Sequence, residues 1–309
     1  MGGLPTLADF GGTLAVYTTI YRGVEPYLVD WCRSLRRQTD PEFQLWIGLD
    51  QLGSESVKHI LEFDLKANWV VAPPGASPAQ IRQQALARIV ETCSGVVLVD
   101  SDDLLHSSRV ASARSALQVS ELAGCALCLI DQQGKDLDLT FNLPPRLEPD
   151  EVFPRNNVFG FSNSAYRSDI LRRCLPIPST AVLVDWFLAT RAWLSGARLA
   201  FDRVPRMDYR QHPANTARVR FPFSRDQVIS DTVLVRRHFE LFLAEPASDY
   251  LADRYAALRR VASDVEVFHQ YITVDPAQLD GYVEALNALH PPPLWWSCVA
   301  YPALGHMWS

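Results

Sequence analysis

The sequence predicts an α/β fold, in which a mostly parallel β-sheet is flanked by helices and followed by a helical C-terminal extension. Apolar, strand-like segments alternate with amphipathic helical segments over about the first hundred residues, which is typical of parallel strands joined by crossover helices. Two of these strand-like segments end on carboxylates, at Asp50 and Asp100. Beyond Ser224 the pattern becomes long and helical. Ligands bind outside the carboxyl ends of the strands in such sheets, so the two acids mark an expected binding site.

The first half of the chain is expected to supply four strands and the three helices between them. Apolar and β-branched residues predict strands at residues 13–20, 42–50, 68–74 and 95–100. Apolar residues at helical spacing predict helices at residues 25–39, 54–65 and 77–95.

The third of these helices carries the clearest boundary signals. Ser77 is a suitable N-cap, Pro78 occupies the first helical position, and Gln80 can complete a capping box with Ser77. Gly95 follows the helix and is expected to end it.

The second half of the chain is less regular. A strand and turn are expected at residues 124–135, a Pro-rich connection at 142–157, a helix at 179–196 and a strand at 197–201. We expect one α/β domain over residues 1–224, with a first half at 13–105 and a second half at 106–224. Residues 225–309 form the expected helical extension, whose Trp-rich end reads as irregular.

Composition narrows the class of protein. The formal net charge is −6 and the pI is about 5.7, which argues against a general nucleic-acid binder. No apolar run reaches the length of a membrane span, and the N-terminus lacks the pattern of a signal peptide, so we expect a cytoplasmic protein. Cys125 and Cys128 have a spacing seen in metal and redox sites, but they lie in a strand-like segment with no second Cys or His pair nearby. All six cysteines are therefore expected to be core residues.

The segment Asp-Ser-Asp-Asp at residues 100–103 directly follows the fourth expected strand. Carboxylates that alternate at a strand end can direct two acids to one point, and such oxygen ligands suit Mg²⁺ or Mn²⁺. A divalent cation would in turn neutralise a diphosphate leaving group. The alternative interpretation is a solvated turn that caps the next helix, and Asp103 is the acid for which that alternative is strongest.

The order of motifs resembles the family 2 glycosyltransferases. The segment at 15–50 is similar to that family's opening strand, helix and second strand, and 100–103 resembles its Asp-x-Asp motif. The segments at 159–171, 184–196 and 209–217 resemble its acceptor-site, catalytic-base and Tyr-Arg-x-His-x-x-Asn segments. The resemblance covers about residues 13–220. It implies the GT-A (Rossmann-like) fold and an inverting transfer of a sugar from a nucleotide-diphosphate sugar to an acceptor hydroxyl, in polysaccharide or glycoconjugate synthesis. It also implies that 13–105 is the nucleotide-binding half of the domain and 106–224 the acceptor-binding half.

The resemblance also implies the roles of individual residues. Asp185 would be the general base, Asp102 and His212 would hold Mn²⁺ or Mg²⁺, and Asp50 would contact the nucleobase. The full set of expected nucleotide-sugar-binding residues is Thr18, Thr19, Asp50, Arg82, Asp100, Ser101, Asp102 and Arg210.

Two residues are candidates for contact with the acceptor, and each has a structural alternative. Trp186 could stack on a sugar or belong to the core, and Asn163 could bind the acceptor or stabilise a turn. Asp185 could likewise be only a residue that caps its helix.

The chain departs from the family pattern at Gln51, Gln83 and Val184. These departures leave open a non-catalytic relative that binds carbohydrate or a partner protein. A sugar nucleotidyltransferase would share the fold, but the turn at 21–26 is a poor match for its glycine-rich signature. Trp295, Trp296, Tyr301 and Trp308 could pack as core, mediate a homodimer, or make peripheral contact with a membrane.

Overall fold

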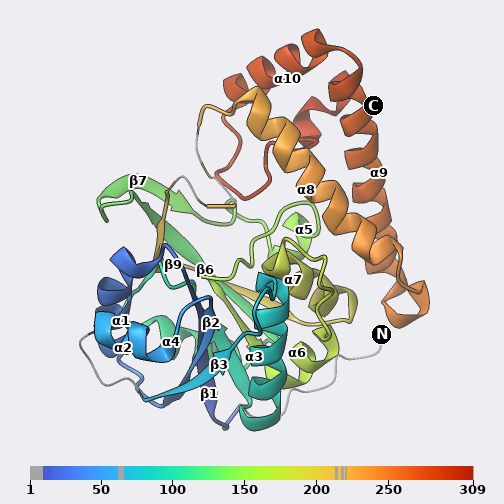
Figure 1. The fold of residues 1–309 in the computed structure, drawn as a ribbon. Helices are drawn as coiled ribbons and strands as arrows, with labels where there is room; N and C mark the ends of the chain where they lie inside the picture. The colour runs from blue at the N-terminus through green and yellow to red at the C-terminus, as the bar shows by residue number, and fades with distance from the viewer. Residues whose placement is uncertain (1–9, 62–65, 213–214, 217–218, 220, 309) are drawn as a thin grey trace.

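The computed structural model describes residues 10–61, 66–212, 215–216, 219 and 221–308. In this part of the chain nine strands form one sheet, with the order β3-β2-β1-β4-β8-β6-β9-β5 and with β7 paired to β6 (Figure 1). The strands are β1 (Leu14–Tyr21), β2 (Phe43–Asp50), β3 (Ala67–Val71), β4 (Gly95–Leu98), β5 (Leu104–Leu105), β6 (Leu122–Ile130), β7 (Asp136–Phe141), β8 (Ser164–Arg167) and β9 (Leu199–Arg210).

The strands of the sheet run mostly in one direction. The parallel pairs β1–β2, β1–β4, β2–β3 and β6–β9 and the antiparallel pairs β4–β8 and β6–β8 give six strands, β1, β2, β3, β4, β6 and β9, the same direction. Strands β5, β7 and β8 run the opposite way. The predicted mostly parallel α/β fold is therefore confirmed.

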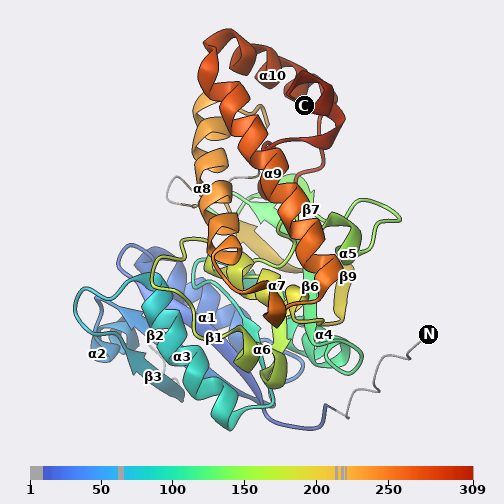
Figure 2. The ribbon, with the colours of Figure 1, turned by 90° about the vertical axis from the view of Figure 1, so that its right-hand side faces the viewer.

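The helices that cover the sheet follow from the handedness of the crossovers. They are α1 (Leu28–Arg36, preceded by the 3₁₀ turn Glu25–Tyr27), α2 (Ser54–Leu61), α3 (Pro78–Thr92), α4 (Arg109–Ala116), α5 (Pro149–Val152), α6 (Ser168–Cys174) and α7 (Val184–Leu194). Because β1, β2 and β3 step one way across the sheet and β4 returns to the far side of β1, right-handed crossovers place α1 and α2 on one face and α3 on the other. Helices α6 and α7 pack beside α3 on that second face (Figures 1 and 2).

The first-half elements lie where the sequence placed them, to within a few residues. The capping box at the start of α3 is present, since Gln80 N–H donates to Ser77 Oγ and the Gln80 side chain accepts from Ser77 N–H. The expected helix at 54–65 is seen to Leu61, and residues 62–65 lie outside the described part.

The second half differs more from expectation. Residues 179–183 are not helical, so the expected helix begins late, at Val184. Strand β9 continues to Arg210, well beyond the expected end at residue 201, because it pairs with both β6 and β5.

The chain beyond Ser224 forms α8 (Arg225–Leu243), α9 (Ala252–Val274) and α10 (Pro276–Leu289), with short 3₁₀ turns at Ala247–Asp249 and Pro302–Met307. Figures 1 and 2 show these helices standing at one end of the sheet, over α7 and α5. Phe187 of α7 stacks on Phe242 of α8, with ring centroids 5.2 Å apart. Within the described residues, no helix is both long enough and apolar enough to cross a membrane.

Candidate active site

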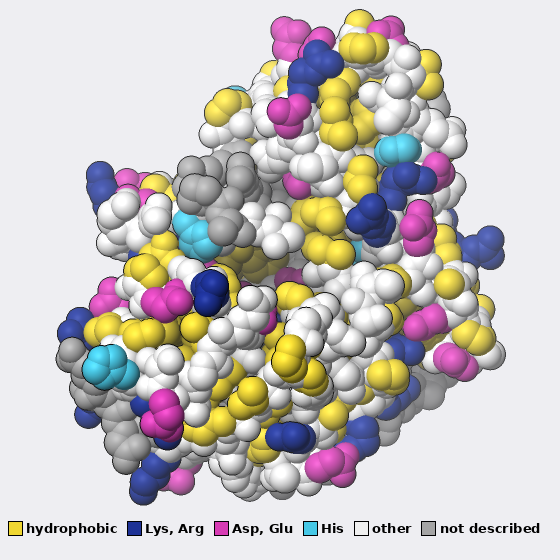
Figure 3. All heavy atoms as spheres, viewed as in Figure 1, with side chains coloured by type: hydrophobic (Ala, Val, Ile, Leu, Met, Phe, Trp, Pro, Cys, Tyr) yellow, Lys and Arg dark blue, Asp and Glu magenta, His cyan; other side chains and the backbone are white. Residues whose placement is uncertain are grey.

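A cleft of about 500 Å³ opens at the carboxyl edge of the sheet. It lies beside the point between β1 and β4 where the strand order reverses. Its walls come from the ends of β1, β2, β4 and β9, the starts of α3 and α7, and a segment that follows α10. Figure 3 shows the molecular surface hollowed between the sheet and the C-terminal helices. Seven of the predicted site residues line this cleft: Thr19, Asp50, Arg82, Asp100, Asp102, Asp185 and His212.

One side of the cleft is built by strand ends and by the first turn of α3. Asp50 ends β2 and is the register partner of Tyr21 at the end of β1. Arg82, one turn into α3, lies 3.6 Å from Asp100 and holds its guanidinium 4.2 Å above the ring of Phe161. The capped start of α3 therefore fixes a cation between the carboxylates and an aromatic ring.

Three carboxylates lie close together here, with Asp100 and Asp102 lining the cleft and Asp103 buried behind it. The Ser162 hydroxyl bonds to both Asp100 and Asp103, and the backbone N–H of Arg210 donates to Asp103 at 2.7 Å. Burial raises the pKa of Asp100 to about 7, against the lowering effect of Arg82, and burial also raises the pKa of Asp103. The cluster therefore carries less than its full negative charge near neutral pH, and a cation would be needed to ionise it completely.

Asp102 and His212 form the part of the cluster best suited to hold a cation. His212 Nε2 lies 2.8 Å from Asp102 Oδ2, and the Tyr21 hydroxyl donates to the same oxygen at 3.3 Å. The His212 ring is stacked on Tyr27 at 5.6 Å, which fixes its orientation. A carboxylate oxygen and an imidazole nitrogen are ligands that Mn²⁺ accepts.

This pair is an incomplete coordination set. Among the described residues, the only group of three or more His, Cys, Asp or Glu side chains with closely gathered ligand atoms lies elsewhere, at His106, Cys128 and Asp208. Two protein ligands leave positions for water and phosphate oxygens, as is usual for cations that bind with a nucleotide.

Asp185 lies in the first turn of α7 and faces the same cleft. Asn157 donates its amide to Asp185 Oδ2 at 3.1 Å. Burial raises the pKa of Asp185, although the Trp186 backbone N–H, Arg82 and Asn157 each oppose the rise. A carboxylate with a raised pKa is a stronger base than an exposed aspartate, so this residue is suited to accept a proton.

Four expected donor or acceptor residues lie behind the wall of the cleft. Thr18, Ser101 and Asn163 are fully buried, and Arg210 is 2% exposed. Ser101 Oγ donates to the carbonyl of Thr19, and Arg210 donates through its guanidinium to the carbonyls of Asp102, Asp131 and Gln132. The Asn163 amide donates to the carbonyls of Cys125 and Val158. These side chains position the site, and we assign no ligand contact to them.

Trp186 also lies beneath the cleft. Its side chain is fully buried, stacked between His238 at 4.2 Å and Trp296 at 6.2 Å, with ring planes 13° and 3° apart. Burial lowers the pKa of His238 to about 3, so this imidazole ring is neutral where it stacks on Trp186. The aromatic ring that faces the cleft above Trp186 belongs to Trp296.

Sequence reasoning did not predict that the segment after α10 reaches the cleft. Trp295 bridges to Asn157 across a short antiparallel contact, and its carbonyl accepts from the Asn156 amide at 3.2 Å. Trp295 also packs on Phe141, with ring centroids 4.1 Å apart. Of the three roles left open for these tryptophans, packing within the chain is the one observed, since Trp295, Trp296 and Trp308 are all buried.

The backbone of the tail shows that its position is set by its surroundings. Trp296 adopts a left-handed conformation with φ of 66°, which is unusual for a bulky residue and marks a position held by its surroundings. Residue type does not predict such a conformation, so the position of the tail could not be predicted from the sequence pattern.

No protein-family model matches the chain, and no curated protein matches it by sequence. Solved structures do match by fold. TarS from S. aureus gives a TM-score of 0.53 at 15% identity. The match covers 86% of this chain but only 44% of the TarS chain. A shorter TarS, 1–349 with UDP, gives 0.53 at 15% identity over 89% of this chain and 79% of that one.

The mannosyltransferase PcManGT from Pyrobaculum calidifontis, in complex with GDP-Man and Mn²⁺, gives a TM-score of 0.50 at 15% identity and covers 94% of this chain and 85% of that one. At this level of identity the likeness concerns the fold. The chain thus shares the fold of proteins solved with UDP, UDP-GlcNAc or GDP-Man bound.

Proposed function

We propose that this protein is a metal-dependent, inverting glycosyltransferase that moves a sugar from a nucleotide-diphosphate sugar to an acceptor hydroxyl. One observation carries the proposal: a single cleft holds the Asp102–His212 pair and Asp185, a carboxylate whose pKa is raised. A cation ligand set and a base in one cavity are what transfer from a diphosphate requires. The neighbours in fold were solved with nucleotides and, for the mannosyltransferase, with Mn²⁺.

The donor would occupy the side of the cleft formed by the first four strands. Asp50 would accept hydrogen bonds from the nucleobase, while Thr19 and Arg82 would flank the ribose and diphosphate. Asp102 and His212 would hold Mn²⁺ or Mg²⁺, and this ion would neutralise charge on the departing diphosphate. Arg210 supports this side indirectly, because it holds the backbone of Asp102 and the carboxylate of Asp103 in place.

Asp185 would take the proton of the attacking hydroxyl at a carboxylate oxygen. Asn157 donates to Oδ2, which helps to fix the orientation of the carboxylate. The burial that raises the pKa of Asp185 makes the carboxylate a stronger base than an exposed aspartate. Attack from the side of Asp185 on a donor held at Asp102 is a single displacement, which inverts the anomeric centre.

The acceptor would lie against Trp296, which covers Trp186 and faces the cleft near Asp185. Flat aromatic rings suit the apolar faces of sugars, so we propose a carbohydrate or glycoconjugate acceptor. On this assignment residues 1–224 form the transferase domain, and the extension at 225–309 completes its acceptor site.

The test is a thermal-shift panel of UDP-, GDP-, dTDP- and CMP-sugars, with and without Mn²⁺, followed by assay of donor consumption. We expect one nucleotide class to raise the Tm in a Mn²⁺-dependent way, and Asp102→Ala to remove the gain. Asp136→Ala, which alters an exposed carboxylate on β7, is the matched control and should keep the gain.

Absence of stabilisation by every nucleotide would contradict the proposal. Stabilisation without any Asp185-dependent donor consumption would instead identify a non-catalytic carbohydrate-binding relative.

A further inference from the structure

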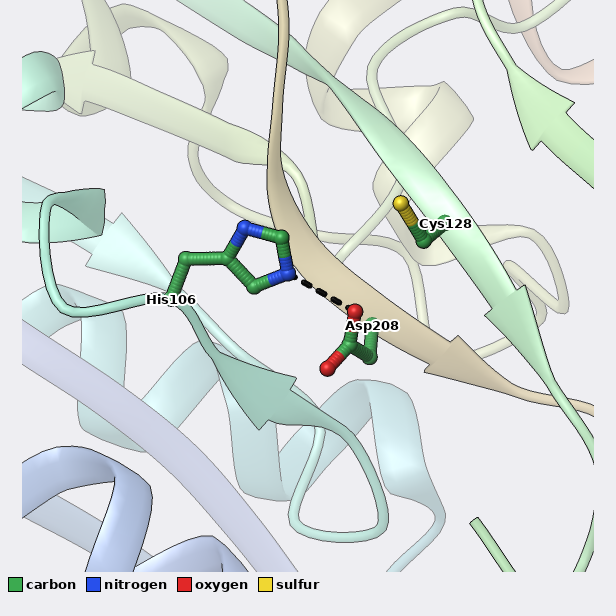
Figure 4. A group of neighbouring side chains, drawn as sticks. All are labelled: His106, Cys128 and Asp208. Atoms are coloured by element: carbon green, nitrogen blue, oxygen red, sulfur yellow. Dashed lines mark hydrogen bonds and ion pairs between the residues drawn. The ribbon is translucent and has the colours of Figure 1, made fainter. Parts of the chain in front are cut away.

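We propose a second metal site, distinct from the cleft, in which His106, Cys128 and Asp208 bind a transition-metal cation such as Zn²⁺. One ligand atom from each residue lies within 4.8 Å of the others (Figure 4). Imidazole, thiolate and carboxylate are the three ligand types found in protein zinc sites. This inference is independent of the proposed function, because it rests on a different set of side chains.

Three neighbouring strands set the geometry of the site. Cys128 of β6 and Asp208 of β9 are direct partners in the parallel ladder, and Leu104 of β5 pairs with Asp208 from the other side. His106 follows β5, and its backbone N–H donates to the carbonyl of Arg206 at 3.0 Å. The ligands therefore stand on paired strands, which hold positions better than loops do.

The hydrogen bonds of His106 fix the orientation of its ring relative to Asp208. Nδ1 lies 3.0 Å from the carbonyl of Pro205 and Nε2 lies 2.7 Å from Asp208 Oδ1. A carbonyl can only accept, so Nδ1 must carry a proton. Nε2 then faces an oxygen of the Asp208 carboxylate, an arrangement that suits either a proton or a metal between the two atoms. A backbone carbonyl on Nδ1 is the arrangement that commonly orients a metal-binding histidine.

Cys128 is the cysteine best placed to reach a cation from solvent. The other five cysteines are buried, whereas Cys128 is partly exposed and forms no hydrogen bond to a described residue. Burial and the nearby Asp208 and Asp136 raise the pKa of this thiol, so it is neutral until a cation displaces its proton. The expectation that all six cysteines are core residues is thus wrong for Cys128.

The charges around the site do not oppose a cation strongly. Asp208 and Asp136 are negative, and the nearby Arg206 is paired with Asp202 at 2.7 Å. Arg33 and Arg37 line the adjoining hollow, and Arg33 is 3.3 Å from Asp30. A tetrahedral zinc ion with bonds of about 2.0 to 2.3 Å holds its ligand atoms roughly 3.5 Å apart, so the thiol must approach and the His106–Asp208 pair must open slightly.

Binding would release two protons, one from the Cys128 thiol and one from Nε2 of His106. It would also join β5, β9 and β6, which lead to the Asp103 and Arg210 pair behind the cleft. The expected role is structural: the ion would hold the strands that carry the cleft's acidic floor.

The test uses the full chain and two probe ions, Co²⁺ for spectroscopy and Zn²⁺ for affinity. Co²⁺ should give an intense thiolate-to-cobalt charge-transfer band, and none of the described residues that line the cleft is a cysteine to give one there. Zn²⁺ at a hundredfold excess over its Kd should raise the Tm by about 5 °C. Raising the pH by one unit between 6 and 7 should strengthen zinc binding at least about tenfold, since the Cys128 thiol, whose pKa is raised, must lose its proton.

Cys128→Ser should abolish the cobalt band, and His106→Ala should weaken zinc binding at least tenfold. His59→Ala removes an exposed histidine in the last turn of α2 and should change neither. All measurements are repeated on Asp102→Ala, so that binding in the cleft does not contribute. No cobalt band in that protein, or a band and affinity unchanged by Cys128→Ser, would show that His106 and Asp208 are an ion pair only.

Discussion

The two sides of the cleft are assembled in different ways. The donor side comes from β1, β2 and β4 and the start of α3, which follow one another along the first hundred residues. The acceptor side joins Asn157, the start of α7 and Trp296, and the hydrogen bond from Asn156 to Trp295 spans 139 residues of sequence. The donor side can therefore be understood from local patterns, whereas the acceptor side depends on how distant segments pack.

The largest effect on transfer is expected on the acceptor side, from a change at Asp185. Asp185→Asn keeps the size of the side chain but removes the base, so transfer should fall between about a hundredfold and ten-thousandfold. Nucleotide binding on the donor side should be unchanged by isothermal titration. Asp226→Asn, which alters a first-turn acid of α8 outside the cleft, is the matched control. Transfer that survives Asp185→Asn would remove this residue from the role of base.

Gly160 tests how tightly the two distant segments fit. A Cβ at this position would lie 2.3 Å from the Trp295 ring, so Gly160→Ala forces the tail away from the wall of the cleft. We expect the free energy of unfolding to fall by about 1 to 3 kcal/mol, measured by urea denaturation, with a parallel loss of transfer. Gly281→Ala in α10 meets nothing closer than 3.9 Å and should be neutral or stabilising. If the two variants behave alike, the contact with Trp295 is loose.

Asn157 tests the acceptor side through the pH dependence of the transfer rate. Its hydrogen bond favours the charged form of Asp185, so Asn157→Ala should raise the pKa of that carboxyl further. Transfer needs the carboxylate and is lost as the pH falls through this pKa. The acid limb of the rate profile already lies above the ordinary aspartate range, and it should move to still higher pH, with about a tenfold loss of rate at fixed acidic pH. Asn156→Ala, whose amide binds Trp295 instead, should leave the limb in place.

The smallest effect is expected on the donor side. Ser77→Ala removes the N-cap of α3 and should cost about 1 kcal/mol, seen as a fall in Tm of roughly 1 to 2 °C. Ser77→Asp keeps a capping oxygen and serves as the control. A fall well beyond this range would mean that the start of α3 depends on more than its cap.

The sequence predicted those features whose cause is local. The capping box of α3 and the strand-end acids Asp50 and Asp100 follow from residue order, and the structure shows each one. Trp186 could not be placed in this way, because a tryptophan beside a base suits both a sugar platform and a core. Its full burial is decided by Trp296, which lies more than a hundred residues later.

The candidate metal site is a second feature that the sequence alone could not predict. In the sequence, Cys128 and Cys125 have a spacing seen in metal and redox sites. In the structure, the residues beside Cys128 are instead His106 and Asp208, which the strand register brings close to it. Register across β5, β9 and β6 depends on pairing between segments that carry no matching signal. Only the folded sheet reveals the group.

The long sequence separation between Asn156 and Trp295 has a consequence for folding. Contacts of such high contact order form only after the intervening chain has been ordered, so the acceptor wall should be completed late in folding. It should also open before the donor strands when the protein is partly destabilised. Amide hydrogen exchange would then show two cooperative units, with the bridge between Asn157 and Trp295 exchanging earlier than β1 and β4.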